Sequence, residues 1–154
     1  MKKYLNKIIS LNYLIKSPSI EQVNHLYTQL MEENSNILKE THQFFQKGDI
    51  YYNLNKAEIV NIIEEGNDLK ITISTNTFEN GVALGKKPIV LKIHTKEKKK
   101  LDIEIGCIIT MAVVHNNQIG FVYHKNEKLS NDIIDFKTIE LNDKICFSKR
   151  NRYK

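Results

Sequence analysis

The sequence predicts an α+β protein in which N-terminal helices precede a mostly antiparallel, barrel-like β-domain of about seven or eight strands. Two observations predict this fold class. Apolar residues recur every three or four positions through residues 1–47, and from residue 49 onward they alternate with polar residues. A chain of 154 residues can bury one such core. We therefore expect a helical region, residues 1–47, and a β-rich barrel-like domain, residues 48–154, that ends in a basic tail.

Polar segments divide the helical region into separate helices. The apolar face of the first consists of Met1, Tyr4, Leu5, Ile8, Leu11 and Ile15. Pro18 fits the first turn of the next helix, where Ser19 and Gln22 form a capping box. The polar residues 34–36 can break this second stretch in two, and Gly48 is expected to cap its C-terminal end.

The first strands of the β-domain are expected over residues 49–54, 58–64 and 68–75, with a turn at residues 66 and 67. Residues 56–65 could instead form a short helix, because Asn55 and Glu58 can cap one. The β-branched apolar residues of this segment favour the strand.

The later strands follow the same alternation. A loop over residues 76–87 and a lysine-rich turn over 96–100 are expected to flank a strand at 88–94. Further strands are expected at 101–105, 107–114, 118–124, 133–141 and 144–148, with a loop at 125–132. Segment 107–114 is nearly all apolar, which indicates a strand covered on both faces. Asn116 and Asn117 suit a tight hairpin turn because Asn tolerates positive φ.

The positive charge is concentrated in separate stretches of the chain. Lys, Asn and Ile make up 60 of the 154 residues, which indicates an AT-rich coding background, and the net charge is +5. Residues 17–80 carry a net charge of −6, whereas residues 81–101 carry +6 and residues 137–154 carry +4. Composition bias accounts for the abundance of lysine but not for this segregation.

Two of these stretches are candidate nucleic-acid-binding sites. The candidates are Lys86, Lys87, Lys92, Lys96, Lys98, Lys99, Lys100, Lys149, Arg150, Arg152, Tyr153 and Lys154. Ammonium groups at a hairpin tip can follow a phosphate backbone, and Tyr153 could stack on a base. The scarcity of arginine predicts weakly sequence-selective binding. Solubilising lysines at a sheet edge are the alternative interpretation.

A second hypothesis places a protein partner on the helices. Tyr27, Leu30, Ile37 and Phe44 share one apolar face, which would suit a protein–protein inhibitor or an assembly subunit. The compact chain and its AT-rich background suggest an accessory protein of a phage or mobile element. We expect a non-enzymatic binding protein that engages nucleic acid or a nucleic-acid-handling complex, with the inhibitor as the alternative.

The sequence contains no recognisable catalytic, metal or cofactor motif, and we predict no catalytic residue, no metal site and no cofactor. The five histidines form no HxxxH pair, and there is no CxxC motif or phosphate-cradling glycine loop. Cys107 and Cys146 lie in apolar stretches, which favours buried free thiols in a reducing, cytoplasmic compartment. No run of residues is apolar enough to predict a transmembrane helix.

Two short segments resemble a known family. Residues 47–52 (Lys-Gly-Asp-Ile-Tyr-Tyr) are similar to the opening strand of PemK/MazF-type ribonuclease toxins, which are small SH3-like barrels. Residues 87–90 (Lys-Pro-Ile-Val) are similar to the later Arg-Pro-aliphatic strand of that family. Lys87 stands where the family has its catalytic arginine, so no catalytic role is carried over. A small barrel-type ribonuclease is therefore our second alternative.

Overall fold

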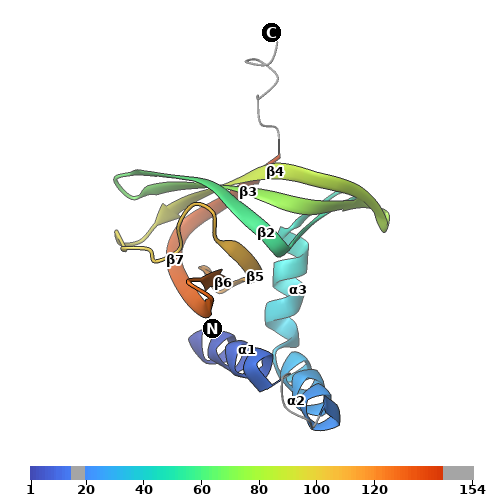
Figure 1. Ribbon diagram of the computed structural model, residues 1–154. Helices are drawn as coiled ribbons and strands as arrows, with labels where there is room; N and C mark the ends of the chain where they lie inside the picture. The colour runs from blue at the N-terminus through green and yellow to red at the C-terminus, as the bar shows by residue number, and fades with distance from the viewer. Residues whose placement is uncertain (15–19, 144–154) are drawn as a thin grey trace.

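The computed structural model describes residues 1–14 and 20–143. In this part of the chain, three helices precede a β-barrel, which confirms the predicted α+β class (Figure 1). The helices are α1 (Lys2–Leu14), α2 (Ile20–Glu33) and α3 (Ser35–Phe44). The strands are β1 (Gln46–Lys47), β2 (Ile50–Glu65), β3 (Asp68–Glu79), β4 (Val82–Thr95), β5 (Ile108–His115), β6 (Gln118–Lys125) and β7 (Lys128–Asn142).

The barrel consists of two antiparallel three-stranded meanders. The first is β2–β3–β4 and the second is β5–β6–β7. They join along two seams, since β4 pairs with β7 and β2 pairs with β5. The inward-facing side chains form one core in which Ile71, Ile73 and Phe121 have no exposed surface.

The helices pack against the outside of the second meander, and Figure 1 shows them on the side of the molecule away from β3 and β4. Leu5 and Ile8 of α1 contribute to a second apolar cluster that includes Val113 of β5 and Val122 of β6. A Cβ atom at Gly120 would lie 2.7 Å from Leu5 Cδ1. The absence of a side chain at Gly120 therefore allows α1 to approach β6 closely.

Several predicted boundaries are confirmed and others are wrong. Residues 56–65 are strand, and Asn34 separates α2 from α3 as expected. Gly48 does not cap α3; with φ +59° it forms the turn between β1 and β2. The loop predicted at 76–87 is β-structure, because the antiparallel pairing of β3 with β4 continues to a tight turn at Asn80 and Gly81. The loop predicted at 125–132 is a tight turn at Asn126 and Glu127, both with positive φ.

Residues 96–107 form a long connection between β4 and β5, so both the hairpin tip predicted at 96–100 and the strand predicted at 101–105 are wrong. In the segment predicted as a strand at 101–105, a buried side chain supplies the hydrogen bonds that a neighbouring strand would supply. Asp132 Oδ2 accepts hydrogen bonds from the backbone N–H groups of Asp102 (3.1 Å) and Ile103 (2.8 Å). The strand predicted at 144–148 lies outside the described residues. Of the helices in residues 1–14 and 20–143, none has the length and apolarity needed to cross a membrane.

Candidate functional site

The structure distributes the candidate lysines of residues 86–100 along β4 and the connection that follows it. Lys86 and Lys87 lie opposite Asn76 and Thr75 of β3. Lys92 lies six residues after Lys86 on the same strand. Lys96, Lys98, Lys99 and Lys100 begin the β4–β5 connection and are exposed. From Lys86 to Lys96 an extended strand covers about 33 Å. The lysines therefore form a line and not a finger.

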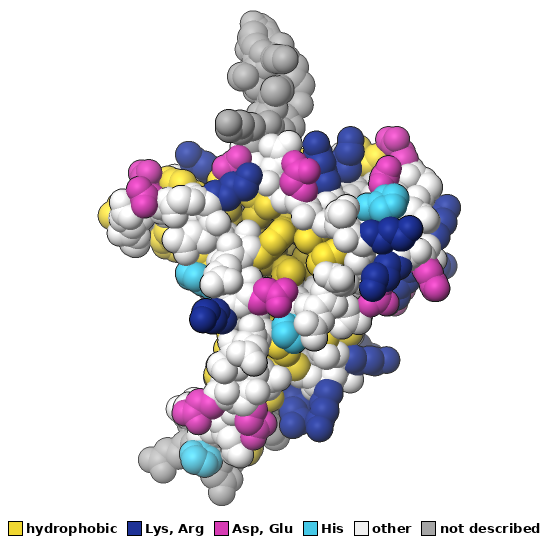
Figure 2. Space-filling model, turned by 180° about the vertical axis from the view of Figure 1, so that it is seen from behind, with side chains coloured by type: hydrophobic (Ala, Val, Ile, Leu, Met, Phe, Trp, Pro, Cys, Tyr) yellow, Lys and Arg dark blue, Asp and Glu magenta, His cyan; other side chains and the backbone are white. Residues whose placement is uncertain are grey.

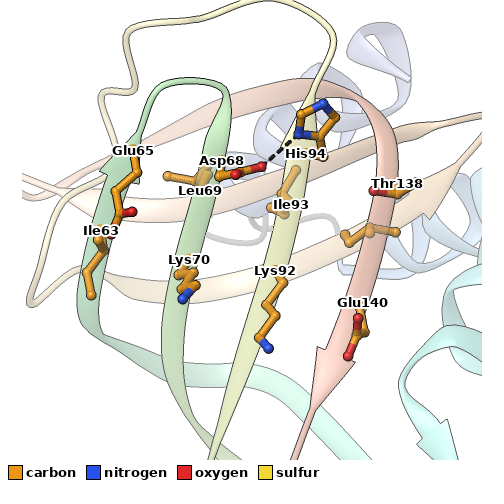
Figure 3. Close-up of a pocket in the computed structure, with 11 residues that line it drawn as sticks. Ile63, Glu65, Asp68, Leu69, Lys70, Lys92, Ile93, His94, Thr138 and Glu140 are labelled. Carbon is orange, nitrogen blue, oxygen red and sulfur yellow. Dashed lines mark hydrogen bonds and ion pairs between the residues drawn. The ribbon is translucent and has the colours of Figure 1, made fainter.

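Lys92 is paired with Lys70, a lysine that lies outside the basic stretches of the sequence. Lys70 of β3 is the cross-strand partner of Lys92, and the two side chains point the same way on the outward face of the sheet (Figure 3). Ile63 flanks Lys70, and Glu140 flanks Lys92, in the same register row. Within the described residues, no carboxylate oxygen lies within 4.0 Å of either ammonium group.

The next row across the same strands holds a histidine–carboxylate pair. His94 Nδ1 lies 2.7 Å from Asp68 Oδ1, with Glu65 and Thr138 on either side of this pair (Figure 3). The two rows line a shallow hollow of about 490 Å³. The two central strands thus hold Lys70 and Lys92 in one row and Asp68 and His94 in the other, and Glu65 and Glu140 lie on the flanking strands.

Part of the lysine-rich connection is engaged within the chain. Lys99 Nζ donates a 2.5 Å hydrogen bond to the carbonyl oxygen of Ile133. On the face shown in Figure 2, Lys side chains are interspersed with Asp and Glu side chains. That face is therefore of mixed charge. The remaining candidates, Lys149, Arg150, Arg152, Tyr153 and Lys154, lie outside the described residues.

The helix face expected to dock a protein partner is largely used inside the chain. Leu30 and Ile37 are only 5% and 9% exposed, since both belong to the apolar cluster between the helices and the barrel. Phe44 packs partly against the barrel core. Tyr27 is 37% exposed. Of the four residues, Tyr27 alone presents a substantially exposed side chain, so the expected docking face is reduced to this position.

The buried groups of the described barrel include a tyrosine hydroxyl and a free thiol. The Tyr123 hydroxyl is buried and has no hydrogen-bond partner within the described residues. Burial raises the pKa of Tyr123, and the Asp132 carboxylate raises it further. Cys107 is a buried free thiol. No group of three or more His, Cys, Asp or Glu in the described part of the chain is placed to hold a metal ion.

Comparisons with known proteins add no assignment. No family model, curated protein or solved structure matches this chain. The two segments that resemble the ribonuclease toxins lie on β1–β2 and on β4, and β3 separates them in the sheet.

Proposed function

We propose that the protein is a non-enzymatic binding protein that contacts the phosphate groups of nucleic acid along the outward face of β4. We call the contributing residues the β4 basic line; they are Lys70, Lys86, Lys92, Lys96, Lys98 and Lys100. The observation that carries the proposal is the cross-strand pair Lys70–Lys92, two like charges held side by side on an exposed face.

A like-charge pair at directly opposite positions destabilises a sheet. The nearest cross-strand acid, Glu140, forms no ion pair with Lys92 within 4.0 Å. A phosphate group between Lys70 and Lys92 would relieve the repulsion, because phosphate oxygens accept hydrogen bonds from ammonium groups. The cost of the pair in the free protein would then be offset in the complex.

The residue types also set the expected mode of binding. Lysine acts on phosphate as a compact point charge and lacks the planar fork with which arginine reads guanine. Glu65, Asp68 and Glu140 also line the hollow and would repel a broad polyanion. Contact should therefore be narrow, dominated by phosphate and weakly dependent on base sequence.

Salt-dependent binding tests the proposal. We expect fluorescence anisotropy with labelled single-stranded DNA, single-stranded RNA and duplex DNA to show binding that weakens steeply between about 20 and 300 mM NaCl. In the double variant Lys70→Gln/Lys92→Gln, the slope of log K against log salt for a single strand should fall by about 1.4, the value for two lost phosphate contacts.

The matched control is Lys7→Gln/Lys128→Gln, which removes the same charge from exposed positions on α1 and on the β6–β7 hairpin. This control should leave the slope close to that of the parent chain. Absence of binding at low salt, or equal loss in both double variants, would reject the β4 basic line as a nucleic-acid site.

A further inference from the structure

The barrel is split over part of the seam between β2 and β5. In the described residues, these strands pair at Ala57–Ile109 and at Glu58–Ile108, and two further backbone bonds join Ile59 to the residues just before β5. Residues 52–55 of β2 and 110–113 of β5 line a hollow of about 1040 Å³ that separates the two strands beside α3. Two strand edges therefore face a shared groove.

At the outer end of each strand edge, backbone groups form hydrogen bonds with residues of α3 or of the segment that follows it. On β5, Thr41 Oγ1 of α3 accepts a hydrogen bond from the Val114 N–H (2.9 Å) and lies 3.2 Å from the Val114 carbonyl oxygen. On β2, the Tyr52 N–H donates to the carbonyl oxygen of Phe45 at 2.9 Å. These bonds show which way the backbone groups of Val114 and Tyr52 point.

Alternate residues of a strand direct their backbone groups to the same side. Ala112 therefore directs its N–H and C=O into the groove as Val114 does. On β2 the regular pairing with β3 is interrupted between Asn53 and Glu58, and Leu54, the first residue of this irregular stretch, lines the groove. Within the described part of the chain, neither Leu54 nor Ala112 is among the residues that pair β2 with β5. Unpaired backbone groups on a strand edge are a template for another strand.

We propose that this groove binds an extended peptide segment of a partner protein, which adds a strand between β2 and β5 and completes the wall of the barrel. Such β-augmentation takes its affinity from main-chain hydrogen bonds and its specificity from alternate side chains. Leu54 and Ala112 would bond to the backbone of the inserted segment from its two sides.

The walls of the groove define the chemistry of the peptide. The lining is mostly apolar and aromatic, and the ring of His42 stacks on that of Tyr51 with centroids 4.6 Å apart. Lys39 and His42 are the ionisable side chains of α3 that line it, and its described lining contains no Asp or Glu. The groove therefore suits a segment that alternates apolar residues with at least one carboxylate. The chain's own residues 144–154, which carry five basic residues and no acid, are a poor match.

A random decapeptide display library selected against the full chain supplies the probe. We expect apolar–acidic sequences to be enriched, and the synthetic form of the best of them to bind in isothermal titration. Methylating alternate backbone amides of this peptide should weaken binding at least about tenfold, because each methyl group removes a main-chain donor. In the complex, the amides of Leu54 and Ala112 should exchange with solvent more slowly.

Two variants separate the groove from other surfaces. Lys39→Glu on α3 should lower the affinity for the acidic peptide by about three- to tenfold. Lys7→Glu on α1 should leave this affinity unchanged. Failure to select any peptide, indifference to backbone methylation, or unchanged exchange at both amides would overturn the proposal. Protection of the same amides by a dimer in the absence of peptide would overturn it in favour of a second copy of the chain. None of these outcomes depends on nucleic-acid binding.

Discussion

The two halves of the barrel have the same inward face but different outward faces. On β5 and β6, the outward-facing Val113 and Val122 are buried beneath the helices. On β3 and β4, the corresponding positions hold Lys70 and Lys92, which are exposed. The covered half, which is the second meander beneath the helices, therefore has apolar residues on both faces. In the uncovered half, which is the first meander, apolar inward-facing residues alternate with polar or charged outward-facing residues.

This difference separates the two halves of the barrel by what covers their outward faces. The covered half obtains stability from burial on both faces, at roughly 25 cal/mol per Å² of apolar surface. The uncovered half gives up that burial and displays charged residues on a rigid sheet, which positions them more accurately than a loop does. Under the proposed function, phosphate contact would fall mainly on the first meander, whereas the helices are buried against the second.

The largest expected effect is on the covered half. Leu5 is fully buried between α1 and the barrel, so Leu5→Ala should lower the free energy of unfolding by about 3 kcal/mol. Urea denaturation followed by circular dichroism measures this loss. Lys3→Ala on the exposed side of the same helix is the control and should change stability little. Equal losses in both variants would show that α1 does not stabilise the barrel through this contact.

Alkaline pH should weaken the same interface by a smaller amount. Burial raises the pKa of Tyr4 from 10.0 to about 12, with a smaller contribution from Tyr27. Folding therefore favours the neutral phenol, and this contribution is complete below pH 10 and is lost as the pH rises towards 12. Between pH 9 and 11 the parent chain should lose about 1 kcal/mol more stability than Tyr4→Phe. Urea titrations in which the parent chain and Tyr4→Phe lose the same free energy of unfolding over this pH range would contradict the role of Tyr4.

The smallest expected effect has the opposite sign. Lys70→Glu places a carboxylate opposite Lys92 and should raise the free energy of unfolding by about 0.5 kcal/mol while it weakens nucleic-acid binding. Lys7→Glu, which has no cross-strand partner, should show no such gain in urea denaturation. A gain in stability without loss of binding would show that Lys70 does not contribute to nucleic-acid binding by the β4 basic line.

The sequence predicts the strands of the covered half better than the exposed hairpin of the uncovered half. The nearly all-apolar segment 107–114 correctly predicted a strand covered on both faces, as the burial of Val113 and Val114 shows. Residues 76–87 are β-structure where the sequence predicts a loop, and this exposed hairpin holds two Asn and two Gly residues. In contrast, 101–105 has a strand pattern but bonds to the Asp132 side chain, a contact that local alternation does not encode.

The candidate site was predictable only in part, because register is a tertiary property. Lys92 was selected from its charged stretch, whereas Lys70 becomes its partner only through the pairing of β3 with β4. Leu30 and Ile37 show the converse. An apolar helix stripe fits a partner and the chain's own barrel equally well, and only the fold reveals that the barrel covers it.

The two seams of the barrel also have a consequence for folding kinetics. Within each meander, neighbouring strands connect through tight turns, so their contacts are local in the chain. The seam pairs Ala57–Ile109 and Val90–Asn142 each join residues 52 positions apart. Loop-closure entropy penalises both seams alike, and contacts of long sequence separation slow folding. The meanders are therefore expected to form first and the seams to close last, with the split β2–β5 seam the first to reopen.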